Sequence, residues 1–147
     1  RPESRGWVRI RSADPAVAPA IRYNYLDTQA DRRKMVDGLK LLRRIVNADA
    51  MRPYVEKEEL PGVRVASDED WLAFCRETGE TVYHPTSTCR MGTDAGSVVD
   101  ERLQVRGMDA LRVVDASVMP AVVSGNTNAA VIAVAEKGAD LILEDAG

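Results

Sequence analysis

The residues best suited to chemistry lie around His84, the single histidine of the chain. An imidazole has an unperturbed pKa of about 6.5, which suits proton transfer near neutral pH. Pro85 follows directly and disfavours helical backbone at the residue before it, so we expect His84 on extended or turn backbone. The alternative is a structural histidine satisfied inside the fold, and this segment alone does not separate the two roles.

Further blocks follow the segment from Tyr83 to Gly92. They run from Val113 to Pro120, from Ser124 to Ala130 and from Ala135 to Ile142. In this order they resemble the C-terminal region of the glucose–methanol–choline (GMC) family of FAD-dependent oxidoreductases, in the branch of choline and alcohol dehydrogenases. The opening stretch from Arg1 to Leu26 resembles the start of the same region, so the resemblance covers nearly the whole chain.

The resemblance implies oxidation of an alcohol, choline-like or another primary alcohol, to the aldehyde by hydride transfer to FAD. His84 would be the catalytic base, and Asn126 falls where the family carries a second catalytic His or Asn. The Asn126 amide can orient a substrate oxygen without competing for the proton. Helix capping is the alternative reading of this residue.

The same resemblance implies a set of FAD contacts. Asp115 and Ala116, at a strand-to-loop corner, match positions that contact FAD chiefly through backbone. Thr127, Asn128 and Ala129 would start the last helix, whose free N–H groups and dipole suit developing negative charge. Many family members carry Gly in place of Ser87, and a positive φ there would strain a serine.

The phosphate-binding unit of a dinucleotide site is absent from this sequence. No Gly-x-Gly-x-x-Gly turn follows a predicted strand, and the chain does not begin with methionine. We therefore expect residues 1–147 to be one C-terminal substrate-binding and catalytic region, inactive alone. Its expected partners are its own N-terminal FAD-binding domain, of Rossmann type, and a small-molecule alcohol, with the electron acceptor unknown.

Composition agrees with one globular region of 147 residues. The net charge of −3 gives no reason to expect nucleic acid or an anionic membrane as partner. No apolar run is long enough to span a bilayer and no secretory leader is visible, so we expect a cytoplasmic location, with a leader on a missing N-terminal part left open. Cys75 and Cys89 are too few for a zinc site or a disulfide framework, so no metal is expected.

Hydrophobic periodicity predicts an α+β fold: an antiparallel sheet with flanking helices, and a C-terminal helix that packs on the FAD domain. Strands are expected at 6–12 (half-buried), 21–23, 97–100, 103–105 and 111–114. Helices are expected from about Thr28 to Ala50, from the Ser67 cap to Gly79, and from Asn126 or Asn128 to about Glu144.

Two other functions remain open from the sequence. The chain could be a stand-alone, non-catalytic binding module that keeps the sequence of the family without its chemistry. It could also belong to an oxidase that uses oxygen as acceptor, because oxygen reactivity depends on local access and charge.

Overall fold

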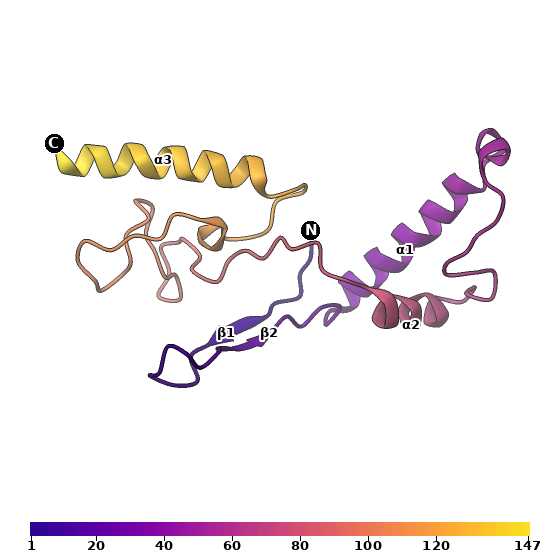
Figure 1. Cartoon of the computed structure of the whole chain (residues 1–147), viewed down its shortest axis with the longest axis horizontal. Helices are drawn as coiled ribbons and strands as arrows, with labels where there is room; N and C mark the ends of the chain where they lie inside the picture. The colour runs from indigo at the N-terminus through magenta and orange to yellow at the C-terminus, as the bar shows by residue number, and fades with distance from the viewer. The chain divides into compact units, whose positions relative to one another are not determined.

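The computed structural model describes residues 1–147, and its elements confirm the α+β class. In chain order they are β1 (Trp7–Arg9), β2 (Ala20–Arg22), α1 (Gln29–Val46), η1 (Asp49–Tyr54), α2 (Asp68–Thr78), η2 (Ala116–Val118) and α3 (Asn128–Ala146) (Figure 1). The two strands pair into a small antiparallel sheet. None of the helices has the length and apolarity that crossing a membrane would require.

The prediction of a half-buried strand over 6–12 is wrong in extent and in burial. β1 covers only Trp7–Arg9, and all three of its residues are exposed. Alternating side chains are buried only where another layer packs on one face of the sheet. In this chain the sheet has only two strands, and neither face of β1 is covered, so its alternating side chains stay exposed.

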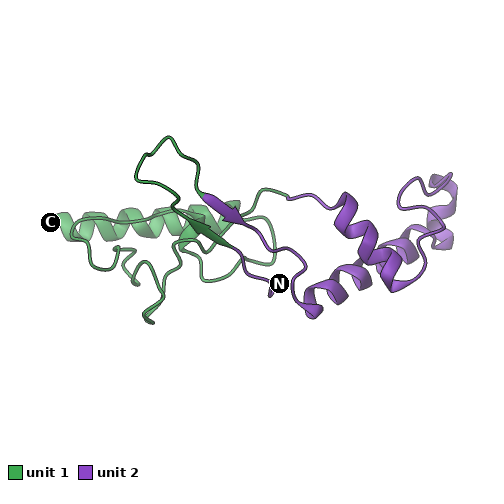
Figure 2. Cartoon of the chain, turned by 90° about the horizontal axis from the view of Figure 1, so that it is seen from below, with its two compact units in different colours: residues 1, 7–19, 82–147 green, residues 2–6, 20–81 purple.

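The chain divides into two compact units (Figure 2). Unit 1 contains residues 1, 7–19 and 82–147, with η2 and α3. Unit 2 contains residues 2–6 and 20–81, with α1 and α2.

The helices of unit 2 begin where their caps predict. Thr28 accepts a hydrogen bond from the Asp31 N–H at the start of α1, and Ser67 and Asp70 form a complete capping box on α2. Gly79 follows the end of α2 as expected. α1 ends at Val46 instead of near Ala50, because the chain turns into the 3₁₀ helix η1.

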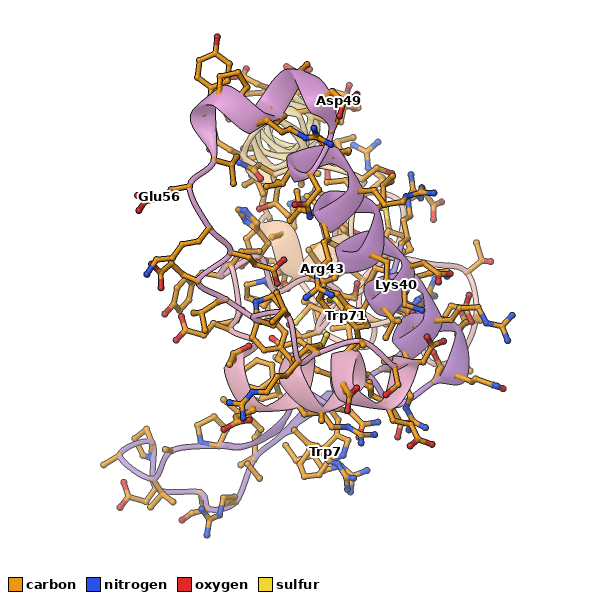
Figure 3. All side chains as sticks on the ribbon, turned by 90° about the vertical axis from the view of Figure 1, so that its right-hand side faces the viewer. Trp7, Lys40, Arg43, Asp49, Glu56 and Trp71 are labelled. Atoms are coloured by element: carbon orange, nitrogen blue, oxygen red, sulfur yellow. The ribbon has the colours of Figure 1, made fainter.

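Arg43 joins α1 to α2. Its guanidinium carbon lies 4.1 Å from the centre of the Trp71 ring, and Trp71 is only 2% exposed. The same guanidinium forms a bidentate ion pair with Glu58, at 2.6 and 3.0 Å, and donates to the Val65 carbonyl at 2.6 Å. Figure 3 shows Arg43 and Trp71 close together between the two helices. One side chain therefore ties together α1, the connecting segment and α2.

A buried carboxylate fixes the first residues of unit 2 to α1. Asp31 accepts hydrogen bonds from the backbone N–H groups of Glu3 and Ser4, at 2.9 and 2.7 Å, and from the Ser4 hydroxyl at 2.5 Å. Burial favours the neutral acid, but these hydrogen bonds outweigh it and hold the pKa of Asp31 well below its usual range. The charged form of Asp31 is thus the one that holds this segment.

Unit 1 is mostly irregular before α3. The strands predicted at 97–100, 103–105 and 111–114 do not form; only isolated bridges join Met91 to Val99, Val99 to Val105, and Gln104 to Arg112. The chain reverses too often for a ladder to extend, with a left-handed glycine at Gly107 (φ 76°) between the last two segments.

α3 covers the core of unit 1. This core is a cluster of buried apolar side chains: Val99, Leu103, Val118 and Leu141. At Gly138 the helix passes so near the core that an added Cβ would lie 2.5 Å from a Val114 methyl group. At the other end, Asp145 pairs with Arg102 and Arg112, which fixes the last turn of α3.

Candidate functional site

His84 lies on irregular backbone in unit 1, as its proline neighbour predicts, and is half-buried. Two non-glycine residues close to it have left-handed backbone: Tyr83 (φ 58°) and Ser87 (φ 72°). The backbone strain expected for a serine with positive φ is therefore present at Ser87, because this residue has the conformation that glycine adopts without penalty. Such strain persists only where the surrounding structure enforces it. Asn24, Leu26, Leu103 and Ala110 share the left-handed backbone elsewhere in the chain, so the strain does not by itself mark the site.

The segment after His84 runs beside η2. The Cys89 N–H donates to the Ser117 carbonyl at 3.0 Å, and the Met91 N–H donates to the Val118 carbonyl at 2.8 Å. Two sequence blocks that both belong to the resemblance thus meet through backbone hydrogen bonds. Their pairing gives the histidine segment a fixed support on the core, since Val118 is fully buried.

Asp115 and Ala116, both predicted FAD contacts, lie at the start of η2. The Asp115 carboxylate accepts a hydrogen bond from the Ser117 N–H at 2.7 Å and so caps this short helix. Asp115 is exposed and Ala116 is half-buried. One carboxylate oxygen of Asp115 is therefore engaged by the turn, and the second oxygen of this exposed residue and the backbone are left for any contact with a ligand.

Thr127 connects His84 to α3. The hydroxyl oxygen of Thr127 lies 2.9 Å from Nδ1 of His84, within hydrogen-bond distance, although the two residues are 43 positions apart. Thr127 is buried, with 7% of its surface exposed. The sequence placed Thr127 at the helix start but gave no signal for this side-chain contact.

At or just before the start of α3 lie three further predicted site residues, Asn126, Asn128 and Ala129. Thr127, and not Asn126, is the N-cap, so the capping interpretation of Asn126 is wrong. Asn126 is exposed, and its amide makes no hydrogen bond to His84. Asn128 and Ala129 form the exposed first turn, where no side chain caps the helix and the backbone N–H groups stay free.

Ser117 is a residue of this region that the sequence reasoning missed. Its hydroxyl oxygen is buried and has no hydrogen-bond partner. A buried hydroxyl without a partner is unfavourable, so it points to a polar group that this chain does not supply. Only its position directly after Asp115 and Ala116 could have drawn attention to it.

Comparison with known proteins identifies the family. The model of the GMC oxidoreductase family matches residues 2–135, so the chain belongs to the GMC oxidoreductases. An alcohol dehydrogenase [acceptor] from Pseudomonas putida is 47% identical over 142 residues, which are 97% of this chain and 26% of the relative. An oxygen-dependent choline dehydrogenase from Pseudomonas savastanoi is 46% identical over the same length.

Solved structures agree with this assignment. Pyridoxine 4-oxidase from Mesorbium loti superposes with a TM-score of 0.89 at 39% identity, over 95% of this chain and 27% of the oxidase. Formate oxidase from Aspergillus oryzae superposes with a TM-score of 0.88 at 32% identity, over 95% of this chain and 25% of the oxidase. The chain spans about a quarter of the length of the relatives it matches.

Proposed function

We propose that residues 1–147 are the C-terminal substrate-binding and catalytic region of an FAD-dependent enzyme that oxidises an alcohol, choline-like or another primary alcohol, to the aldehyde. The observation that carries the proposal is the bond between His84 and Thr127, because it joins a proton acceptor to the free N-terminus of α3. The curated relatives named alcohol and choline dehydrogenase support the substrate class.

The chain contains groups that fit a bound flavin. The free N–H groups of the first turn of α3 suit negative charge, and the buried hydroxyl of Ser117 lacks a partner. Asp115 and Ala116 would hold FAD through their backbone, and Thr127, Asn128 and Ala129 through the helix N-terminus. FAD, when bound, supplies the acceptor for the hydride.

In this proposal the protein residues handle the proton and the orientation of the substrate. His84 accepts the hydroxyl proton of the alcohol at its free ring nitrogen. Asn126, exposed beside Thr127, donates a hydrogen bond to the substrate oxygen and keeps it directed at the base. The tie between the histidine segment and η2 keeps the base in place during the reaction.

The proposed main partner is an N-terminal FAD-binding domain of Rossmann type. α1 supports it, because apolar side chains at helical spacing are left uncovered: Met35, Leu42 and Ile45 are 46%, 54% and 53% exposed. The relatives are about four times as long as this chain, so they contain ample sequence to cover such a face. The packing of α3 on that domain remains a prediction.

An oxidase is the second candidate. The solved neighbours named pyridoxine 4-oxidase and formate oxidase favour it. The curated relatives named dehydrogenase are more similar in sequence, at 45–47% identity. The two candidates differ in the second half-reaction, so mixing the reduced full-length enzyme with oxygen and following flavin reoxidation distinguishes them.

The test of the proposal is His84→Ala in the full-length enzyme. Loss of a general base slows the step that it serves by roughly a hundredfold or more, so we expect anaerobic reduction of the flavin by substrate to slow by about that factor. FAD content should stay unchanged, because no proposed FAD contact involves the His84 side chain. Reduction within a few-fold of the wild-type rate would show that His84 is not the base and would favour a non-catalytic module.

A further inference from the structure

The bond between Thr127 and His84 replaces a bond that Thr127 would ordinarily make. A threonine at an N-cap usually accepts a hydrogen bond from a backbone N–H of the first turn. Thr28 and Ser67 do so on α1 and α2, and both have extended backbone, with ψ of 150° and 162°. Thr127 instead has helical backbone, φ −74° and ψ −14°, and makes no capping bond.

The hydroxyl of Thr127 is thus directed at the imidazole, and α3 has no side-chain hydrogen bond at its N-cap. Thr127 is buried while His84 is half-buried, so this bond lies on the protein side of the ring. It is the one hydrogen bond of the imidazole with another residue of the chain. The opposite nitrogen, Nε2, makes none.

A neutral imidazole carries its proton on one nitrogen and a lone pair on the other. If Nε2 is to accept a proton, Nδ1 must carry the existing one and needs an acceptor. The Thr127 oxygen lies 2.9 Å from Nδ1 and can accept it. When Nε2 takes up the substrate proton, the Nδ1–H becomes a donor from a cation, and the bond to Thr127 strengthens.

We infer that Thr127 is a positioning residue for the base: its side chain accepts from Nδ1–H of His84 and fixes Nε2 as the basic nitrogen. This inference rests on the proposed role of His84 as the base. It gives the Thr127 side chain a task separate from the backbone contact with FAD at the helix start.

The backbone around His84 makes such a restraint necessary. Tyr83 and Ser87, on either side of the histidine, both have left-handed φ values. A segment with two unfavourable backbone conformations relaxes when its restraints are removed. The backbone bonds of Cys89 and Met91 restrain the segment after Ser87, whereas Thr127 restrains the ring itself.

The test uses the full-length enzyme and measures anaerobic reduction of the flavin by a primary alcohol such as choline. Three variants, Thr127→Val, Thr127→Ser and Thr86→Val, are compared with wild type, and His84→Ala serves as the reference without the base. We expect Thr127→Val, which keeps the shape but removes the acceptor, to slow reduction about tenfold at saturating substrate. FAD content and the substrate concentration for half-saturation should stay as in wild type. Thr127→Ser should restore the rate to within a few-fold. Thr86→Val, which removes another hydroxyl of the same segment, should leave the rate unchanged.

Nitrogen-15 NMR of histidine-labelled enzyme gives a readout that does not depend on the rate. The signals of His84 are those absent from His84→Ala, and we expect a proton on Nδ1 in wild type and a shift toward Nε2–H in Thr127→Val. Any one of three results would overturn the inference. These are a proton on Nε2 of His84 in wild type, a reduction rate of Thr127→Val within twofold of wild type, or a Thr127→Ser variant as slow as Thr127→Val. An unimpaired His84→Ala would instead overturn the proposed function.

Discussion

Unit 2 is organised around two regular helices, α1 and α2, whereas most of unit 1 before α3 is irregular backbone. In unit 2, side-chain caps begin both helices, and one arginine joins them through charge and ring contact. In unit 1, backbone hydrogen bonds between distant segments and the side-chain bond from Thr127 hold the site. Regular helices thus make up much of unit 2, whereas the irregular backbone of unit 1 carries His84 and leads into the start of α3.

Breaking the helix junction of unit 2 should have the largest effect on stability. Arg43→Met removes both hydrogen bonds to Glu58 and the stacking on Trp71, and leaves the partly buried Glu58 carboxylate without its charged partner, with the Gly62 N–H as its remaining donor. We expect unfolding of unit 2 to become easier by about 2 kcal/mol, less than for a fully buried pair. Chemical denaturation followed by tryptophan fluorescence measures this.

Arg44→Met is the matched control for that variant. Arg44 is the next residue on α1 and is exposed, so its replacement should change stability by less than about 0.5 kcal/mol. Equal effects of the two substitutions would show that Arg43 is not the junction between the helices.

The same glycine-to-alanine change should have opposite signs in the two units. On α3, Gly138→Ala gains helix propensity but places a methyl group against Val114, and we expect a net destabilisation of about 1 kcal/mol. On α1, an added Cβ at Gly38 meets no atom within 4 Å, so Gly38→Ala should stabilise by about 1 kcal/mol. Thermal unfolding of both variants tests the contrast, and a shift of the same sign in both would contradict it.

The last expected effect, no larger than either glycine-to-alanine effect, concerns backbone strain beside His84. Ser87→Gly relieves the left-handed conformation and Ser87→Ala does not, while both lose the bond to the Thr86 hydroxyl. We expect the glycine variant to be more stable than the alanine variant by about 1 kcal/mol. Comparing their unfolding midpoints cancels the shared loss, and an alanine variant as stable as the glycine one would show that the strain carries no cost.

The sequence predicted the regular elements of unit 2 more accurately than those of unit 1 before α3. Helix periodicity and caps are local, so Thr28 predicted the start of α1, and Ser67 and Gly79 predicted the start and the end of α2. The strands predicted after residue 97 needed partners that the chain path does not supply, and only single bridges formed. A strand pattern describes one segment, whereas pairing depends on where another segment lies.

The candidate site was partly accessible from sequence. The motifs pointed to His84 and to the start of α3, and the residue types indicated what each could do. The contact between His84 and Thr127 joins residues 43 positions apart, and no periodicity reports such a pair. The partnerless hydroxyl of Ser117 likewise emerges only when burial and hydrogen bonds are known.

Asp31 acts, in polymer terms, as a non-covalent cross-link that closes a loop from Ser4 to α1. The entropy cost of closing a loop grows only slowly with its length, so several hydrogen bonds to one carboxylate are enough to hold it. Unlike a disulfide, this cross-link depends on charge. Because the folded pKa of Asp31 lies below the ordinary 3.8, its stabilisation is complete above that pH and is lost as the pH falls through the lower, folded value. Acid alone can therefore open the loop, with no covalent bond to break.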